Sequence, residues 1–301
     1  MTNQTKTFRG ANCVQHLKRW LEDRTGDASP LDCVAWACSS CGTDRYGLWI
    51  EIVICAESTR YRWVPPGSFT MGLDDDGTER AYLVEVPSHT VILSAGFWVE
   101  DVPCTQGLWK AVMGREPSHF RAPDRPVESV SWDLVQEFIR KLRAHVSGFS
   151  CRLPTEAEWE YTCGHLDGCI EEAAWVHENS AADFDLAGVE YVAPGPSNSK
   201  RRYGPRGTHP VRGKKPNRFG VYDLLGNVLE WCDDAPRVYS LGVIRDPRGT
   251  GSDERVLRGG DWDTKLCETR PTRRFSLDKR YGGGNIGFRL VVPARDGSVP
   301  W

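Results

Sequence analysis

Apolar side chains recur at helical spacing in four segments of the chain. The first covers residues 12–24, where the pattern predicts a short amphipathic helix. Thr105 and Ser131 are polar residues directly before two further periodic segments, so each is predicted as a helix N-cap. The fourth helix is predicted to begin at Thr155, which forms a capping-box pattern with Glu158.

Runs rich in β-branched and aromatic residues predict strands around these helices. Residues 46–55 and 61–64 are expected to form a hairpin, with its turn at residues 57–59. Two further strands are expected at residues 68–72 and 89–99. These strands are short, and in the sequence they lie between the first predicted helix and the other three.

The second half of the chain is dominated by irregular sequence. Residues 165–255 have weak periodicity and frequent Gly, Pro, Asn and Ser, which is typical of long ordered loops. The pattern predicts a loop-rich α+β fold with little regular secondary structure. We take residues 1–60 as an N-terminal extension, a short helix and strand packed on the main domain, and residues 61–301 as that domain.

Composition narrows the classes of function. The chain has 301 residues, a net charge of -3 and 40% hydrophobic residues, so it is globular and has no basic surface for nucleic acid. No apolar run reaches the roughly 18 residues of a membrane span. The start, MTNQTKTFRG, has no apolar signal region. We therefore expect a cytoplasmic protein that binds neither nucleic acid nor membrane.

Eleven cysteines are present, in irregular spacing. Without a secretory signal they are expected to be reduced and mostly buried. Cys38 and Cys41 form the one CxxC motif. No second pair and no histidines at ligand spacing follow it, so the motif by itself does not predict a metal site.

Six sequence blocks, in a fixed order, carry a resemblance to a known family. They are residues 63–72 (WVPPGSFTMG), 126–132 (PVESVSW), 152–161 (RLPTEAEWEY), 217–231 (NRFGVYDLLGNVLEW), 258–262 (RGGDW) and 286–290 (IGFRL). Together they make residues 62–293 similar to the formylglycine-generating-enzyme (sulfatase-modifying factor) family. The resemblance implies a fold similar to C-type lectins.

Enzymes of this family use two cysteines after the Arg-Gly-Gly motif to bind copper(I) and activate oxygen. In this chain the two positions fall on Thr264 and Thr269, and Cys267 lies between them as a weak catalytic candidate. A hydroxyl is a poor ligand for soft copper(I), so no copper is expected. The iron-dependent branch of the family needs histidines that the extension, with His16 alone, does not supply, so no iron is expected either.

The resemblance also implies a structural calcium site at Asp223, Gly226, Val228 and Glu230. Two carboxylates and backbone carbonyls are the oxygen ligands that calcium prefers. The family's ligand pocket is lined by the terminal segment. The matching residues here are Asp261, Trp262, Asp263, Thr264, Thr269, Arg273, Arg274, Phe275, Tyr281 and Asn285.

Arginines beside aromatic residues are typical of binding hot spots, and their planar groups suit a peptide backbone or carboxylate. The sequence thus predicts a non-catalytic recognition module for a protein or peptide, as inactive family members provide in bacterial signalling or defence systems. Three alternatives stay open. They are a formylglycine-generating or related metal-dependent oxidase, a variable target protein of a diversity-generating retroelement, and a structural subunit whose own extension fills the pocket.

Overall fold

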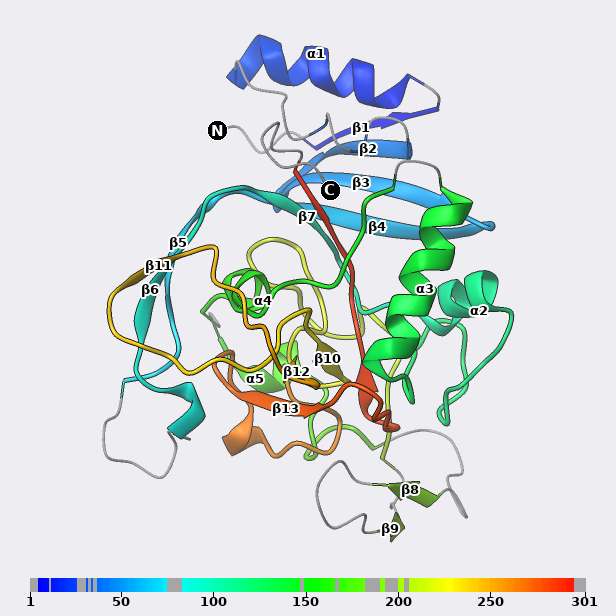
Figure 1. Cartoon of the computed structure of the whole chain (residues 1–301). Coiled ribbons are helices and arrows are strands. Elements are labelled where there is room, and N and C mark those ends of the chain that lie inside the picture. The colour runs from blue at the N-terminus through cyan, green and yellow to red at the C-terminus, as the bar shows by residue number, and fades with distance from the viewer. Residues whose placement is uncertain are drawn as a thin grey trace.

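The computed structural model of the chain describes residues 5–10, 12–25, 31, 34, 37–74, 83–146, 149–165, 168–181, 190–192, 200–202 and 206–294. Helices and mainly antiparallel sheets are mixed in it, connected by long irregular segments (Figure 1). The predicted loop-rich α+β class is confirmed. Within the described residues, no helix has both the length and the apolar composition needed to cross a bilayer.

The largest sheet joins the two ends of the described chain. Its order is β1-β2-β3-β4-β7-β15, with every neighbouring pair antiparallel. The strands are β1 (Lys6–Arg9), β2 (Cys38–Asp44), β3 (Gly47–Ile54), β4 (Glu57–Val64), β7 (Phe97–Glu100) and β15 (Val291–Pro293). The sheet thus runs without interruption from the N-terminal extension into the main domain.

The predicted hairpin is present, but its turn was placed wrongly. The turn falls at Cys55 and Ala56, whose φ angles are 50° and 70°, and residues 57–59 belong to β4. Left-handed backbone at a cysteine and an alanine is uncommon, so the sequence carries no ordinary turn signal there.

Two smaller sheets complete the regular structure of the main domain. One has the order β11-β6-β5, with β5 (Gly67–Met71) antiparallel to β6 (His89–Leu93) and β11 (Val243–Arg245) parallel to β6. The other has the order β13-β12-β10-β14. Its strands are β10 (Leu229–Trp231), β12 (Glu254–Arg258), β13 (Arg274–Asp278) and β14 (Ile286–Gly287), and a separate pair is β8 (Glu190–Val192) with β9 (Lys200–Arg202).

The single strand predicted over residues 89–99 is in fact two strands in different sheets, β6 and β7. The two strands are separated at Gly96, where a β-carbon would lie 2.4 Å from the ring of Trp63. Such an approach needs glycine, which lets the chain cross close to the tryptophan and change sheet.

Each predicted helix is present, and the predicted caps are confirmed. Thr105 and Ser131 accept hydrogen bonds from Leu108 N and Leu134 N, and Thr155 and Glu158 form the capping box. The helical segments are α1 (Cys13–Thr25), α2 (Gln106–Met113), α3 (Trp132–His145), α4 (Glu156–Cys163), α5 (Ile170–Ala173), η2 (Leu83–Glu85) and η3 (Leu266–Glu268).

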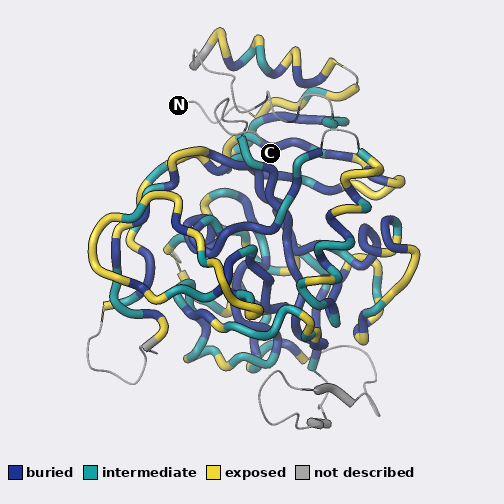
Figure 2. The backbone as a smooth tube through the Cα atoms, in the orientation of Figure 1, coloured by how far each residue is buried: buried dark blue, intermediate teal, exposed yellow. Residues whose placement is uncertain are grey.

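The extension and residues 258–285, which we call the terminal segment, lie at opposite ends of the molecule. Figure 1 shows α1 lying over β1 and β2 at the top, whereas β12, β13 and η2 lie in the lower half. The core between them is continuous, and Figure 2 shows buried chain through the centre of the molecule. One apolar cluster links Leu17 of α1, Tyr61 of β4 and Phe138 of α3. The extension therefore shares the core of the main domain.

Candidate functional site

The two threonines at the cysteine positions have hydroxyl groups that are engaged within the chain. Thr264 Oγ1 donates to Asp261 Oδ1 at 2.9 Å and accepts from Asp261 N at 3.0 Å. Thr269 Oγ1 donates to the carbonyl of Lys265 at 3.0 Å, and the residue is buried. Both hydroxyls thus close local turns within the chain.

Cys267 lies between these threonines on η3 and is exposed. It is the one cysteine in the sequence after Cys232, so the terminal segment has no second sulfur to offer. This part of the chain therefore offers one thiolate, whereas copper(I) in the family's enzymes is bound by two.

Several of the predicted ligand-binding residues are buried, and Trp262, Asn285 and Asp261 form one connected group. Trp262 is fully buried, and its Nε1 donates to the carbonyl of Gly284 at 3.2 Å. Asn285 donates to the buried carboxylate of Asp261, and burial raises the pKa of that carboxyl group. These side chains support the loop after Arg-Gly-Gly from within the molecule, and their predicted contact with a ligand stays a prediction.

The two predicted arginines are paired with acidic side chains. Arg274 makes a bidentate ion pair with Glu156 of α4, with distances of 2.6 and 2.7 Å, and both side chains are nearly inaccessible. Arg273 Nη1 donates to Glu268 Oε2 at 2.7 Å, and its guanidinium lies over the ring of Phe275. Arg274 thus fastens β13 to α4.

Helix α4 is also fixed by Arg258, the arginine of the Arg-Gly-Gly motif. Its guanidinium pairs with Glu160 and donates to the carbonyl groups of Thr272 and Arg273, both at 2.7 Å. Burial lowers the pKa of Arg258 to about 10. Arg258 and Arg274 together hold the terminal segment in one position against α4.

Two predicted residues remain partly accessible beside this scaffold. Asp263 Oδ1 lies 3.0 Å from Nδ1 of His177, a residue that the sequence did not single out. Tyr281 is half-buried, and burial raises the pKa of its phenol. His177 comes from the segment after α5, so only the folded chain brings it to Asp263.

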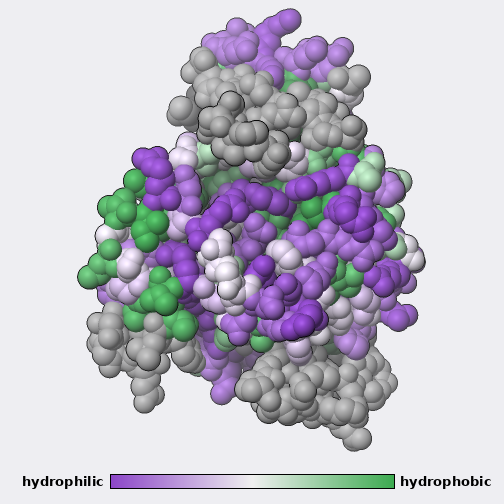
Figure 3. Space-filling view, viewed as in Figure 1, coloured by the Kyte–Doolittle hydropathy of each residue, from purple (hydrophilic) through white to green (hydrophobic). Residues whose placement is uncertain are grey.

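A cavity of about 540 Å³ lies beside β13. Arg273, Arg274 and Phe275 line it, together with two segments distant in sequence that contribute Val84 and Val238. Val84 is 55% exposed, Val238 93% and Phe275 37%. In Figure 3, hydrophobic side chains gather on the side of the molecule that carries β6, β11 and η2. Large apolar side chains exposed around a cavity mark a binding surface.

Strand β13 is the edge of its sheet, because within the described residues it pairs with β12 alone. Among the described residues, no strand covers the outer edge of β13, so this edge can pair with another extended segment. We call the cavity and the outer edge of β13 the β13 groove. Of the ten residues predicted to bind a ligand, Arg273, Arg274 and Phe275 lie in it.

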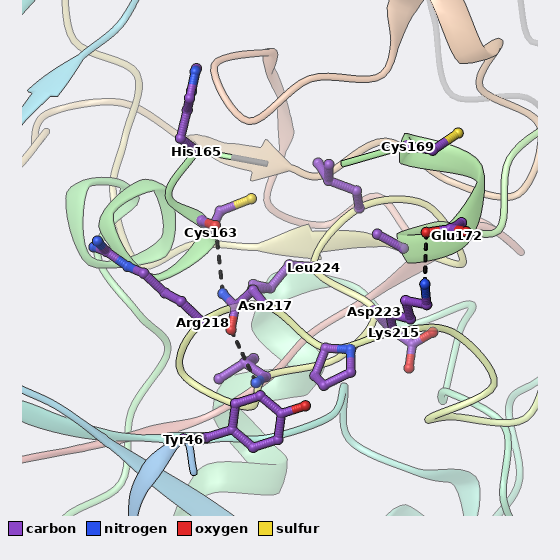
Figure 4. Close-up of a pocket in the computed structure, with 14 residues that line it drawn as sticks. Tyr46, Cys163, His165, Cys169, Glu172, Lys215, Asn217, Arg218, Asp223 and Leu224 are labelled. Carbon is purple, nitrogen blue, oxygen red and sulfur yellow. Dashed lines mark hydrogen bonds and ion pairs between the residues drawn. The ribbon is translucent and has the colours of Figure 1, made fainter. Parts of the chain in front are cut away.

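A second cavity, of about 260 Å³, lies between the β2–β3 hairpin and residues 215–225 (Figure 4). Tyr46 lines it from the extension, and Asn217 donates to the carbonyl of Thr162 at 2.6 Å. Figure 4 shows Lys215 reaching Glu172, a pair separated by 2.8 Å. Asp223, a predicted calcium ligand, also lines this cavity.

The predicted calcium ligands lie on one turn and the strand after it. Asp223 is buried, and its carboxylate accepts from Arg212 N at 2.9 Å and Asn227 Nδ2 at 3.3 Å. Burial raises the pKa of Asp223 to about 6. Gly226 has a φ of 71°, and a β-carbon there would lie 2.0 Å from the carbonyl oxygen of Trp175, so the turn requires glycine.

Glu230 is the second carboxylate of this set and is also buried. Its Oε2 accepts from Trp159 Nε1 at 2.8 Å and Arg289 Nε at 2.7 Å, whereas Oε1 accepts from Arg289 Nη2 at 2.6 Å. Oε1 has one such partner and keeps a second lone pair. The oxygen atoms of Asp223, Gly226, Val228 and Glu230 are of the type that calcium prefers, and Glu230 is already paired with Arg289.

The fold and this site define a class of protein. Antiparallel sheets, few helices and long loops fixed by buried tryptophans and arginines are the architecture of formylglycine-generating-enzyme and C-type-lectin-like proteins. The model of the sulfatase-modifying factor enzyme 1-like domain matches residues 56–294, most of the chain. The chain belongs to this family.

Individual relatives include active and inactive proteins. The chain is 32% identical over 193 residues to a formylglycine-generating enzyme of Streptomyces coelicolor, which covers 62% of this chain and 58% of the relative. It is 29% identical over 210 residues to the inactive C-alpha-formylglycine-generating enzyme 2 of Mus musculus, covering 67% of this chain and 60% of the relative. The chain thus spans little more than half the length of these curated relatives.

Among solved structures, Treponema denticola variable protein 1 is similar, with a TM-score of 0.64 and 26% identity. The match covers 81% of this chain and 98% of that protein. The same fold therefore occurs in a protein described as variable and in proteins described as enzymes.

Proposed function

We propose that this chain is a non-catalytic recognition module that binds an extended peptide segment of a protein partner in the β13 groove. The observation that carries the proposal is a combination of two features. The outer edge of β13 has no partner strand among the described residues, and the rim of the adjacent cavity exposes Val84, Val238 and Phe275. Peptides bind such sites by adding a strand, and their alternate side chains enter pockets beside the edge.

The charge state of the groove supports an apolar side chain in the bound peptide. Arg274 is neutralised by Glu156 and Arg273 by Glu268, so neither arginine brings an unpaired positive charge. Val238 and Phe275 lose exposed apolar surface when a ligand covers them, which favours binding. We propose that the partner is a cytoplasmic protein, in keeping with a role in bacterial signalling or defence.

Two observations support a binding role over oxidase chemistry. The hydroxyls of Thr264 and Thr269 stand where family oxidases have cysteines, and both hydroxyls are engaged in local hydrogen bonds. Similarity to an inactive relative agrees with loss of chemistry on a retained scaffold. Cys267 alone does not supply the two sulfurs that copper(I) chemistry needs.

A selection from a displayed library of random peptides tests the proposal. With the full chain as bait, we expect enrichment of peptides that carry bulky apolar residues within extended sequences. Phe275→Asp and Val238→Asp place a charge in the groove and should weaken binding of the selected peptides more than tenfold, because burying an unpaired charge is costly.

Val53→Asp is the matched control, because Val53 is 52% exposed on β3, at the other end of the molecule. This variant should bind the selected peptides as the wild type does. Absence of enrichment, or equal binding by all the variants, would refute the β13 groove as the recognition site.

A second candidate function is that of a variable target protein. Similarity to Treponema denticola variable protein 1 over nearly all of that chain favours it. In the terminal segment, Lys265, Cys267 and Arg280 are exposed on the main domain and available for variation. Sequencing this locus in sister isolates discriminates the candidates, because retroelement targets differ at exposed positions of this segment while the buried Trp262 and Arg258 stay fixed.

We also propose that calcium is a structural cofactor of the turn at Asp223. Its buried carboxylate has neutral amide groups as its hydrogen-bonding partners, and a cation there would offset the cost of burial. Calcium should raise the melting temperature and a chelator should reverse the rise. Asp223→Asn keeps the shape of the side chain and removes its charge. The calcium concentration that gives half of the rise in melting temperature should increase at least tenfold in this variant. An unchanged melting temperature in the wild type would refute the site.

A further inference from the structure

Three cysteines of the N-terminal extension meet in the folded chain. Cys13 is the first residue of α1, whereas Cys38 and Cys41 lie on β2. Their sulfur atoms all lie within 4.8 Å of one another, and Cys13 Sγ is 3.6 Å from Cys38 Sγ. Within the described residues, this is the one group of three or more potential metal ligands that approach so closely.

A β-bulge brings Cys38 and Cys41 together. In a regular strand, residues three apart point to opposite faces of the sheet. In β2 the register shifts between Cys38 and Ser40, so Cys38 pairs with Ile52 and Cys41 pairs with Ile50. Ile50 and Ile52 are two residues apart on β3 and share the buried face. The bulge therefore directs both cysteines toward α1.

The sulfur atoms are spaced more widely than in a disulfide. A disulfide would hold two sulfur atoms at about 2.05 Å, far shorter than the 3.6 Å between Cys13 and Cys38. Tetrahedral zinc with Zn–S bonds of about 2.3 Å places its sulfur ligands about 3.8 Å apart. The Cys13–Cys38 separation is close to this spacing, and all three sulfur atoms lie within 4.8 Å of one another.

Zinc would bind the three groups as thiolates, because cysteine thiols release their protons to solvent when the metal binds. The N-terminus of α1 also favours negative charge at Cys13.

We propose that Cys13, Cys38 and Cys41 bind a zinc ion through three thiolates, with one position left for a further ligand. The ion would fasten α1 to β2 and so hold the extension on the sheet. This site lies at the opposite end of the molecule from the β13 groove and is independent of the proposed function.

Metal analysis of the full chain, purified under reducing conditions without chelator, tests the proposal. We expect about one zinc per chain, as one shared site implies. Cys38→Ser and Cys41→Ser should each reduce zinc affinity more than tenfold. Cys169→Ser is the matched control, because Cys169 is exposed and distant in the fold, and it should retain zinc. Zinc retained in a Cys38→Ser/Cys41→Ser double variant would overturn the proposal.

Cobalt substitution in the wild type keeps the proposal testable if the variants fail to fold. Cobalt(II) bound by three thiolates should give strong sulfur-to-cobalt charge-transfer absorption and the visible bands of a tetrahedral ion. Absence of both metals after reconstitution under reducing conditions would refute the site. Protein that has been reduced and then supplied with zinc can also be measured by intact mass spectrometry. A mass lower by two hydrogens, with a Cys13–Cys38 disulfide, would refute the site as well.

Discussion

Glu128 lies in the loop before α3, and its carboxyl group is fully buried. Oε1 accepts from Phe120 N at 3.0 Å and Oε2 accepts from Ser129 Oγ at 2.6 Å. These neutral partners do not offset the loss of hydration, and burial raises the pKa of Glu128 from 4.5 to about 7. At the residue scale, this carboxyl group therefore links the stability of the chain to pH.

The sign of the effect follows from proton binding. Between pH 4.5 and 7 the folded chain holds a proton on Glu128 that the unfolded chain has released, so stability falls as pH rises through this window. Glu128→Gln removes this loss. The free energy of unfolding of the variant should exceed that of the wild type by up to about 3 kcal/mol at pH 8, with the difference vanishing toward pH 4.

Denaturant unfolding across this pH range checks the prediction. Glu22→Gln, at an exposed residue of α1, is the control and should follow the wild type at every pH. The prediction fails if the free energy of unfolding of Glu128→Gln differs from that of the wild type by the same amount at every pH. That result would show that the buried carboxyl group ionises with an ordinary pKa.

Single residues also show how far the sequence predicts the site. Thr264 and Thr269 were assigned to the cysteine positions from the Arg-Gly-Gly motif, which fixes the register, and this assignment stays a prediction. The groove was only partly foreseen, since Val84 and Val238 join Phe275 through the fold and no local pattern marks them. Cys13 was not predicted as a third ligand for a different reason. It lies before the CxxC motif in the sequence, and only the fold brings it close to Cys38 and Cys41.

At the scale of elements, the buried ion pair between Glu230 and Arg289 joins β10 to the chain after β14, its parallel neighbour. Both side chains are at most 1% exposed, and the arginine also donates to the carbonyl groups of Glu100 and Tyr222. Helix caps such as Ser131 were predictable because the signal is local. A buried ion pair was expected for Arg289, but its partner Glu230 was not predictable, because the partner depends on how the strands meet.

Glu230→Gln should destabilise the chain by about 3–5 kcal/mol, because it leaves the guanidinium of Arg289 buried without its counter-charge. The measurement is denaturant unfolding in the presence of a calcium chelator, which separates the ion pair from calcium binding. Glu254→Gln, at an exposed residue of β12, should change stability little. Equal losses of unfolding free energy in Glu230→Gln and Glu254→Gln would contradict the structural role of the Glu230–Arg289 ion pair.

At the scale of the whole molecule, the extension is part of the fold. Strand β4 pairs with β3 on one side and β7 on the other, so the six-stranded sheet spans the proposed boundary at residue 60. The described part of the extension lies away from the β13 groove (Figure 1), which counts against the extension as its occupant. Fold class was predictable from ordered motifs, whereas this continuity depends on long-range pairing.

Deletion of residues 1–56 should abolish cooperative unfolding, because it exposes the buried side chains of Tyr61 and Trp98 and removes the partner strand of β4. Calorimetry of the full chain and the truncated chain checks this prediction. A truncated chain that melts cooperatively within a few degrees of the full chain would show that residues 57–301 fold as an independent domain.

The central claim is that a family scaffold with threonines at both cysteine positions binds a ligand without performing oxidation. Oxygen uptake provides the most direct measurement, with the purified chain, copper(I), a reductant and a cysteine-containing peptide in one vessel. The predicted result is uptake equal to that of copper and peptide without protein, with the peptide thiol intact by mass spectrometry. Protein-dependent oxygen uptake with conversion of the cysteine to an aldehyde would contradict the claim.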